Sequence, residues 1–329
     1  MFNKTIASAA TAAVLALSVT PAMAVDEITV AYFLEWPMPM MASKADGSYE
    51  EELGVKINWR SFETGTAMSA AMAAGDVQLS VSQGLPPFVV AASAGQDIQV
   101  LDVAVSYSDN DNCVVHADLE IDKDSADELA GKKVAVPLGT AAHYGFLRQM
   151  NHFGIDLASL EIVNMPPPEG AAALAQKSVD FACGYGGGLT RMKEHGDVLL
   201  TGSEKEELGI LVFDVTSAPA DFVAENQELV SQFLAVTAAA NVKWNETQDE
   251  EMLKVVATEA GMDLDAAKAA ISTMAFPSVD EQLSEKWFGG NVQTFMKGVA
   301  DVFVEAGSID SALDTYENAV NAAPLTDAK

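Results

Sequence analysis

Short apolar segments alternate with helical segments along the first two thirds of the chain. Nine apolar segments have the length and β-branched composition of strands, and helical patterns such as those of residues 67–74, 144–153 and 171–176 separate them. The expected strands are residues 27–34, 55–62, 77–81, 98–105, 113–117, 133–137, 160–164, 179–184 and 210–216. Because strands that alternate with helices form largely parallel sheets with helices on their faces, the sequence predicts an α/β fold.

The last third of the chain has a different pattern. After Pro219 we expect no further strands, because residues 220–306 show helical periodicity, with Ser278 and Glu281 as a capping box after Pro277. Residues 321–329 lack apolar periodicity, so we expect this tail to fray.

The N-terminus has the three parts of an export signal. Lys4 supplies the positive start, residues 6–19 form an apolar run, and Ala22-Met23-Ala24 is a small-x-small cleavage site. We expect cleavage near Ala24 and a soluble, exported chain. Removing 24 of 329 residues leaves 305, which exceeds the usual size of one core and predicts two lobes.

The chain is strongly acidic, with a formal net charge of -30. Lys4 is the only charged residue of the signal, so the mature chain carries -30 - 1 = -31. Such a surface repels phosphate backbones and anionic lipid headgroups. We therefore expect no nucleic-acid partner and a soluble monomer.

Enzyme signatures are weak. The histidines at positions 116, 143, 152 and 195 show no metal-binding spacing, and "GYGGGL" (residues 184–189) departs from a dinucleotide loop because Leu189 replaces its last glycine. The sequence contains neither GxxxxGK nor GxSxG, and nothing in it supports a Ser-His-Asp set. We expect no metal, no cofactor, no catalytic residues and no enzymatic activity.

Polar turns follow several expected strands. In open α/β sheets, ligands bind at the carboxyl ends of the strands, where helix N-termini point free N–H groups into the crevice. The candidate ligand-binding residues in and near these turns are Glu35, Trp36, Thr64, Gly65, Thr66, Ser82, Gln83, Gly84, Thr140, His143, Tyr144, Tyr185 and Asp214.

Two of these turns are suited to hold an anion. A helix is expected to begin at about Thr66, so the Gly65 and Thr66 amides and nearby threonine hydroxyls could hold negative oxygens. Gly139 and Thr140 repeat this arrangement before a second helix. The alternative is that the threonines only cap the two helices, which is their usual role.

Other residues are suited to a cationic group. Asp214 interrupts the apolar strand "GILVFDV", and a carboxylate there needs a cation from the protein or from a ligand. Glu35 could assist, and the rings of Trp36, Tyr144 and Tyr185 could face an ammonium group. For the aromatic residues, packing between the lobes is the alternative.

The sequence resembles the taurine-binding periplasmic proteins of ABC importers, within the wider group of sulfonate-, nitrate- and thiamine-precursor-binding proteins. The resemblance covers about residues 28–222 and is specific in "W-R-x-F-x-[ST]-G" (residues 59–65), "A-x-G-D-V-Q" (73–78) and "V-P-x-x-x-x-x-H-Y" (136–144). It implies a type II periplasmic binding fold with the ligand between two lobes: residues 25–109 plus 214–320, and residues 110–213. The partner would be an ABC permease in the inner membrane.

The resemblance also implies roles for single residues. The turns at 64–66 and 82–84 and Thr140 would hold a sulfonate, and Asp214 would hold an amine. Residues 34–36 and "CGYGGG" depart from the pattern of taurine proteins, so hypotaurine, betaine-like zwitterions and alkanesulfonates stay open beside taurine. Other readings are an enzyme on the same fold, such as a thiamine-pyrimidine synthase, whose cofactor lysine and cysteine-rich motif are lacking here, and a sensor that presents its ligand to a chemoreceptor.

The same resemblance bears on the two cysteines. In type II lobes the strand that enters the second lobe runs antiparallel to its third parallel strand, which places Cys113 opposite Cys183. An exported chain with this pairing is expected to form a disulfide.

Overall fold

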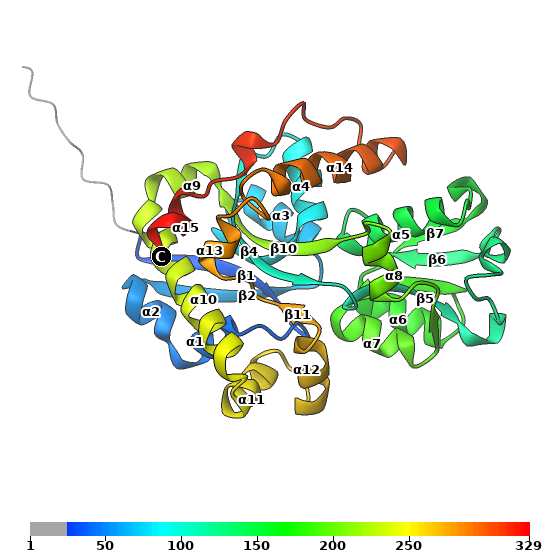
Figure 1. Ribbon diagram of the computed structural model, residues 1–329, viewed down its shortest axis with the longest axis horizontal. Coiled ribbons are helices and arrows are strands. Elements are labelled where there is room, and N and C mark those ends of the chain that lie inside the picture. The colour runs from blue at the N-terminus through cyan, green and yellow to red at the C-terminus, as the bar shows by residue number, and fades with distance from the viewer. Residues whose placement is uncertain (1–24) are drawn as a thin grey trace, which may run out of the picture.

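The computed structural model describes residues 25–329, and the predicted export signal lies outside the described residues. The chain forms two mixed sheets with helices on their faces, and the sheets lie beside one another along the long axis of the molecule (Figure 1). We call the six-stranded sheet and its helices the first lobe, and the five-stranded sheet and its helices the second lobe. The predicted α/β class is confirmed.

The sheet of the first lobe has the strand order β11–β4–β10–β3–β1–β2. β1 pairs in parallel with β2 and β3, whereas β10 runs antiparallel to β3 and β4. All residues of β3 are buried, because helices cover both faces of the sheet. The strands are β1 (Glu27–Phe33), β2 (Lys56–Phe62), β3 (Leu79–Gly84), β4 (Ile98–Tyr107), β10 (Val212–Pro219) and β11 (Met274–Ala275).

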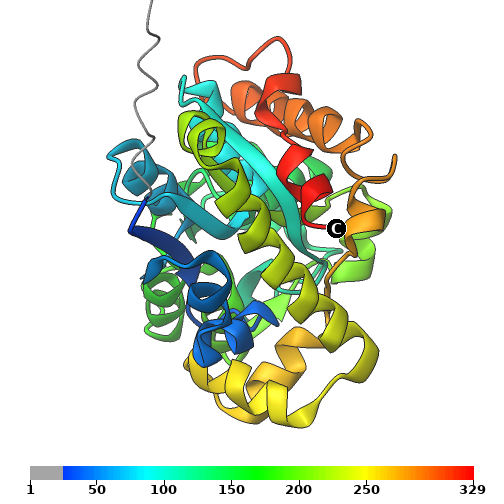
Figure 2. The same ribbon diagram turned by 90° about the vertical axis from the view of Figure 1, so that its left-hand side faces the viewer.

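Most helices belong to the first lobe. The long helix α10 runs diagonally across the face turned to the viewer in Figure 2. The helices are α1 (Met40–Asp46), α2 (Ser48–Leu53), α3 (Gly65–Ala73), α4 (Leu85–Ser93), α9 (Ala220–Glu225), α10 (Gln227–Thr247), α11 (Glu250–Glu259), α12 (Leu264–Ile271), α13 (Val279–Gln282), α14 (Asn291–Glu305) and α15 (Ala323–Asp327).

The second lobe has the strand order β7–β6–β8–β5–β9. Its strands are β5 (Asp111–His116), β6 (Lys133–Val136), β7 (Glu161–Asn164), β8 (Phe181–Tyr185) and β9 (Gly196–Val198). Its helices are α5 (Ala141–His152), α6 (Pro167–Ala175), α7 (Gly186–Lys193) and α8 (Gly202–Glu207). Short 3₁₀ turns span Ala117–Leu119, Ala126–Leu129, Leu157–Ser159 and, in the first lobe, Glu317–Ala319.

The chain passes between the lobes twice, through residues 108–110 and residues 208–211. β4 leads into the second lobe and β10 leads out of it, and Val212 lies opposite Tyr107 in the antiparallel pair of these two strands. The two crossings therefore lie side by side, as a hinge requires. Whether the chain divides into domains at residues 109/110 and 213/214 stays a prediction.

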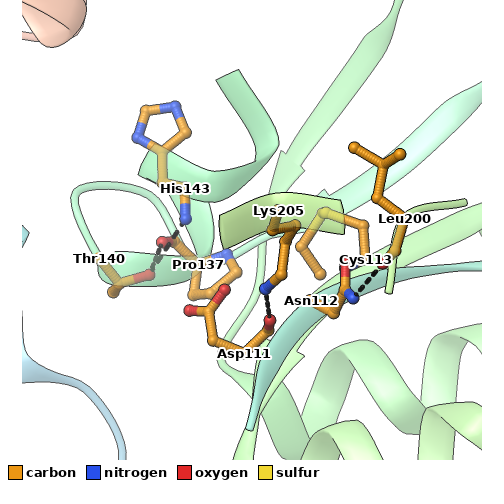
Figure 3. The surroundings of a disulfide bond; sticks show 9 residues. Asp111, Asn112, Cys113, Pro137, Thr140, His143, Leu200 and Lys205 are labelled. Carbon is orange, nitrogen blue, oxygen red and sulfur yellow. Dashed lines mark hydrogen bonds between the residues drawn. A yellow bond between two sulfur atoms is a disulfide. The ribbon is translucent and has the colours of Figure 1, made fainter. Parts of the chain in front are cut away.

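A disulfide joins Cys113 to Cys183 (Figure 3). The two residues face each other in the antiparallel pair of β5 and β8, with their Cα atoms 3.9 Å apart. On the same strand the Asn112 side chain donates to the Leu200 carbonyl at 2.7 Å, and the buried Lys205 ammonium contacts the Asp111 carbonyl. The predicted pairing is confirmed, and it fastens the strand that enters the second lobe.

All nine expected strands are present, with ends that differ by a few residues, but two expectations about the rest of the chain were wrong. A strand does occur after Pro219, because β11 adds to the edge of β4, and its two residues are too few to carry a pattern. The tail is docked rather than frayed: the Asn321 amide donates to the Val100 carbonyl at 2.9 Å, and Leu325 on α15 is buried. The sequence also gave no sign of β9.

Within residues 25–329, none of the helices is long and apolar enough to cross a bilayer. The same residues contain no group of histidine, cysteine or acidic side chains that could hold a metal ion.

Candidate functional site

A small cavity lies between the lobes, where strands of both sheets end and helices begin. About 20 Å³ of it is open to the centre of a water-sized molecule. Six of the predicted site residues line it together with four that the sequence analysis did not select. The lining residues are Phe33, Trp36, Gly65, Gly84, Pro87, Tyr107, Thr140, Ala141, Tyr185 and Asp214. We call this the inner cavity.

Asp214 forms the acidic end of the inner cavity. Its two carboxylate oxygens accept hydrogen bonds from the Ser82 hydroxyl at 2.7 Å and the Tyr107 hydroxyl at 2.8 Å. The Trp36 indole N–H donates to the same Ser82 hydroxyl at 2.9 Å, so Ser82 accepts from Trp36 and donates its own hydrogen bond to Asp214. Within the described residues, no lysine or arginine lies within 4.0 Å of Asp214. The carboxylate therefore has hydroxyl partners but no protein cation.

Burial decides the charge of this carboxyl group. It raises the pKa of Asp214 to about 7, although the hydrogen bonds from Ser82 and Tyr107 act in the opposite direction. Burial, followed by the nearby Asp214 charge, raises the pKa of Tyr107 well above its usual range, so Tyr107 stays a proton donor. A ligand cation here would stabilise the ionised form of Asp214.

Two helix N-termini also contribute to the wall of the inner cavity. Thr64 is the N-cap of α3 and accepts from the Ala67 amide at 3.2 Å, and Thr140 is the N-cap of α5 and accepts from the His143 amide at 3.5 Å. The threonine hydroxyls therefore do cap the helices. The first N–H groups of each helix, including those of Gly65 and Ala141 on the cavity wall, have no acceptor within their helix. These N–H groups can donate hydrogen bonds to the oxygens of an anion.

Gln83 holds one of these helix starts in place from below. Its buried amide donates to the Gly65 carbonyl at 2.8 Å and to the Ser69 hydroxyl at 2.5 Å, and it accepts from the Ser217 hydroxyl at 2.7 Å. Ser82 and Gln83 thus support the site rather than line the cavity. Ser82 adopts a left-handed backbone conformation, with φ of 59°, which aims its hydroxyl at Asp214.

Glu35 pairs with a residue that the sequence analysis missed. Both carboxylate oxygens accept from the guanidinium of Arg191 on α7, at 2.7 and 3.0 Å, so the pair joins the two lobes. Glu35 therefore has a protein cation, and we leave it out of the set of residues proposed to contact ligand. The pair lies beside a larger outer cavity of about 510 Å³, which shares Phe33, Trp36 and Tyr185 with the inner cavity.

The glycine run at residues 186–188 makes this ion pair possible. A Cβ atom on Gly187 would lie 2.4 Å from a carboxylate oxygen of Glu35. Gly186 has φ of +55°, and a Cβ there would lie 2.8 Å from the Glu35 carbonyl. "GYGGGL" is therefore the start of α7, pressed against Glu35. In the sequence, this glycine run was the one sign of a close contact at the start of the helix that carries Arg191.

The lobes are in direct contact across the cleft. The Tyr185 hydroxyl of the second lobe donates to the Glu63 carbonyl of the first at 2.8 Å. The Trp36 and Tyr185 rings meet edge to face, with centroids 6.5 Å apart. A Cβ on Gly139 would lie 3.1 Å from the Thr66 side chain, so these turns also touch. The structure is therefore in a closed arrangement.

Two further predicted residues lie away from the inner cavity. His143 accepts from the Gly139 amide through Nδ1 at 3.1 Å and stacks on Phe303, with ring centroids 5.3 Å apart. Burial lowers the pKa of His143 to about 4, so it is neutral at pH 7. The Tyr144 hydroxyl accepts from Arg148, one turn further along α5, at 2.7 Å. Both residues orient the helix start and do not line the inner cavity.

Sequence reasoning also missed several lining residues. Phe33 and Tyr107 sit at the ends of expected or extended strands, where an aromatic residue reads as core. Pro87 and Ala141 are in the first turns of α4 and α5, and neither carries a polar signal. Only the packing of the two lobes brings these four residues together.

Comparisons with known proteins agree with this architecture. A family model described as "NMT1/THI5 like" matches residues 37–251. The chain is 31% identical over 221 residues to the taurine-binding periplasmic protein of Escherichia coli strain K12, covering 67% of each chain.

Solved structures agree as well. The periplasmic aliphatic sulphonate binding protein SsuA from Escherichia coli matches with a TM-score of 0.72 and 19% identity, over 90% of this chain and 92% of that one. The alkanesulfonate-binding protein SsuA from Xanthomonas axonopodis pv. citri, bound to MOPS, matches with a TM-score of 0.75 and 18% identity, over 90% and 98%. The predicted fold of two lobes around a cleft is confirmed, and the chain belongs to the NMT1/THI5-like family.

Proposed function

We propose that this protein is the periplasmic solute-binding component of an ABC importer and captures taurine or a closely related zwitterionic aminosulfonate. The observation that carries the proposal is the polarity of the inner cavity. Asp214, without a protein cation, and the starts of α3 and α5 line the same cavity. A short zwitterion has this distribution of charge.

The geometry suggests how such a ligand would lie. Its sulfonate would accept from N–H groups at Gly65, Thr66 and Ala141, because helix N-termini favour anions. Its ammonium group would contact Asp214 within the aromatic walls. Those walls are the rings of Trp36, Tyr107 and Tyr185, and ring faces attract a desolvated cation.

Closure follows from contacts on both lobes. Gly65 and Asp214 belong to the first lobe, and Thr140, Ala141 and Tyr185 belong to the second. A ligand that contacts both groups binds the closed arrangement better than an open one, which shifts the population toward closure. The closed form would deliver the ligand to a permease in the inner membrane. We further propose export with cleavage near Ala24, a monomeric state, and no catalytic role.

A second candidate is an alkanesulfonate without an amine. The observation in its favour is the pKa of Asp214, about 7, which allows the carboxyl group to be neutral beside an uncharged ligand tail. Hypotaurine and betaine-like zwitterions fit the charge pattern too. A quaternary ammonium, however, offers no N–H for the carboxylate.

Calorimetric titration of the mature chain tests the proposal. The ligands are taurine, hypotaurine, isethionate, glycine betaine and ethanesulfonate. Taurine and hypotaurine are expected to bind most tightly. Isethionate has a hydroxyl in place of the ammonium group, so equal binding of isethionate and taurine would contradict the role given to Asp214. Binding of none of the five would refute the function.

A further inference from the structure

A third cavity lies at the junction of the lobes, apart from the inner and outer cavities. Its volume is about 590 Å³, within the range of roughly 300–1,000 Å³ that is usual for small-molecule sites. Its lining includes Tyr107, Tyr144, Arg148, Phe213, Trp287 and Phe295, and we call it the hinge cavity. α5 and α14 supply its walls above the crossing strands in Figure 1, whereas α7 and α12 lie below them.

The wall contributed by the first lobe is aromatic. The Phe213 ring meets Trp287 and Phe295 at centroid distances of 5.0 and 5.3 Å, and Phe295 meets Tyr144 of the second lobe at 5.9 Å. Leu211 on the rim is 46% exposed. A continuous set of rings beside an exposed leucine is suited to a flat apolar ligand, because aromatic rings pack edge to face or offset against one another.

The charged groups of the hinge cavity favour an anion. The Arg148 guanidinium donates to the Tyr144 hydroxyl at 2.7 Å and to the carbonyls of Leu208 and Gly209 at 3.1 and 3.4 Å. Among residues 25–329, no carboxylate lies within 4.0 Å of Arg148. These bonds use three of its five N–H donors, so two remain for a ligand, and only an anion neutralises the charge.

The other charges leave this preference in place. Lys286 also lines the cavity and pairs with Glu281 at 2.5 Å. Glu206 is the single acidic residue among the lining residues. Because Glu281 neutralises Lys286, the remaining charges of the lining are Arg148 and Glu206, and these two do not form an ion pair. In the same wall, the buried indole N–H of Trp287 has no acceptor among the described residues.

We propose that the hinge cavity binds a small aromatic anion, a carboxylate or sulfonate, and that this ligand strengthens binding in the inner cavity. The ring of the ligand would pack on Phe213, Trp287 and Phe295, and its anionic group would contact Arg148.

Two features connect the hinge cavity to the inner cavity. Tyr107 lines both, and its hydroxyl donates to Asp214. The hinge cavity and the outer cavity also lie on opposite sides of the crossing strands. A rotation that opens the cleft on one side therefore narrows the hinge cavity on the other. A ligand that fills it therefore favours the closed form, and linkage requires each ligand to raise the affinity for the other.

The test uses the mature full-length chain and 8-anilinonaphthalene-1-sulfonate, an aromatic sulfonate whose fluorescence rises in apolar sites. Gly298 lies on α14 in the cavity wall, and a Cβ there meets no atom within 4 Å. Gly298→Leu therefore places a bulky side chain at the cavity wall, at a position where a Cβ has room, and Gly298→Ala is its matched control. We expect one saturable site in the unmodified chain and in Gly298→Ala, with affinity reduced at least about tenfold in Gly298→Leu. Arg148→Gln should weaken the dye similarly, and thermal unfolding should show that all variants are folded.

Two results would overturn the inference. One is the absence of a saturable site in the unmodified chain, and the other is undiminished dye binding in a folded Gly298→Leu. The coupling is measured by titrating the best cleft ligand with and without saturating dye, and we expect tighter cleft binding with dye. Unchanged affinity contradicts the coupling, and competition between the two places the dye in the cleft. Dye binding does not depend on which cleft ligand the protein takes, so the proposed function can fail separately.

Discussion

Replacing Asp214 by asparagine removes the charge at the acidic end of the inner cavity and keeps the shape of the side chain. Of the Ser82 and Tyr107 hydroxyls, one keeps an acceptor oxygen and the other faces the new NH2 group, from which it can accept. A ligand ammonium group, however, loses its carboxylate partner in a cavity whose lining residues include no other acidic side chain. The substitution should therefore weaken an aminosulfonate and leave a sulfonate without an amine nearly unchanged.

The size of the loss follows from burial. At about 4 Å and an effective dielectric constant near 20, one pair of charges gains about 4 kcal/mol. The carboxyl group has a pKa of about 7, so at pH 7 half of the empty protein must first lose a proton, which costs about 0.4 kcal/mol. Loss of one partner of a buried charge pair usually costs 2 kcal/mol or more. We expect taurine affinity to fall by about 2–3 kcal/mol, or roughly 30- to 150-fold.

Calorimetry with taurine and isethionate on the unmodified chain and on Asp214→Asn gives four affinities, which form a thermodynamic cycle. The ammonium contributes the difference between the two ligands, and that difference should shrink in Asp214→Asn. Asp102→Asn is the matched control, because Asp102 is also a buried carboxylate of this sheet and accepts from the Thr216 amide outside the inner cavity. Unchanged taurine affinity in Asp214→Asn, or equal losses for both ligands, would refute the reasoning.

Three further expectations concern pH, the interlobe ion pair and the disulfide. Because the pKa of Asp214 is about 7, lowering the pH from 8 to 5.5 protonates its carboxylate. Taurine binding should then weaken by up to about tenfold per pH unit below 7, which calorimetry at several pH values measures. An affinity that does not change over this range argues against an ammonium group at Asp214. Arg191→Gln removes a partly exposed ion pair with Glu35, which is worth about 0.5–1 kcal/mol. Small-angle scattering should therefore show a more open ligand-free chain, and titration should show ligand binding that is two- to fivefold weaker. A scattering profile identical to that of the unmodified chain would contradict this. Replacing Cys113 and Cys183 by alanine opens a loop with a sequence separation of 70 and should lower the free energy of unfolding by about 2–4 kcal/mol. Denaturant titration of the variant and of the oxidised parent protein measures this loss. The reduced parent protein is the control and should unfold like the variant.

The fold was largely predictable from the sequence, because apolar periodicity and turn residues mark elements that packing then reinforces. β1 is read correctly for this reason, whereas β3 begins two residues later than expected and includes residues 82–84, which were expected to form a turn. The errors lie where tertiary contacts alone decide. β11 has two residues and exists through its pairing with β4, and α15 is ordered by Leu325, which is buried although its flanking sequence is polar.

The site was predictable only in part. Asp214 and the turns before α3 and α5 stand out, because a carboxylate in an apolar strand and threonines before a helix carry a local signal. The role of Glu35 could not be read in the same way, because its partner Arg191 lies 156 residues further along the chain. His143 was misleading, since its neighbours in sequence line the cavity while its ring stacks on Phe303 behind the helix.

The contact between Glu35 and the glycine run also limits how the sequence of this protein can vary. A side chain at position 187 cannot coexist with the carboxylate that occupies its space, so Gly187 and Glu35 form one unit of variation although they belong to different lobes. A related chain that carries alanine at the position of Gly187 should have a smaller residue at the position of Glu35, and should then have no use for an arginine at the position of Arg191. An alignment of close relatives should therefore show three correlated columns, and reverting one member alone in such a relative should fail to restore the ion pair.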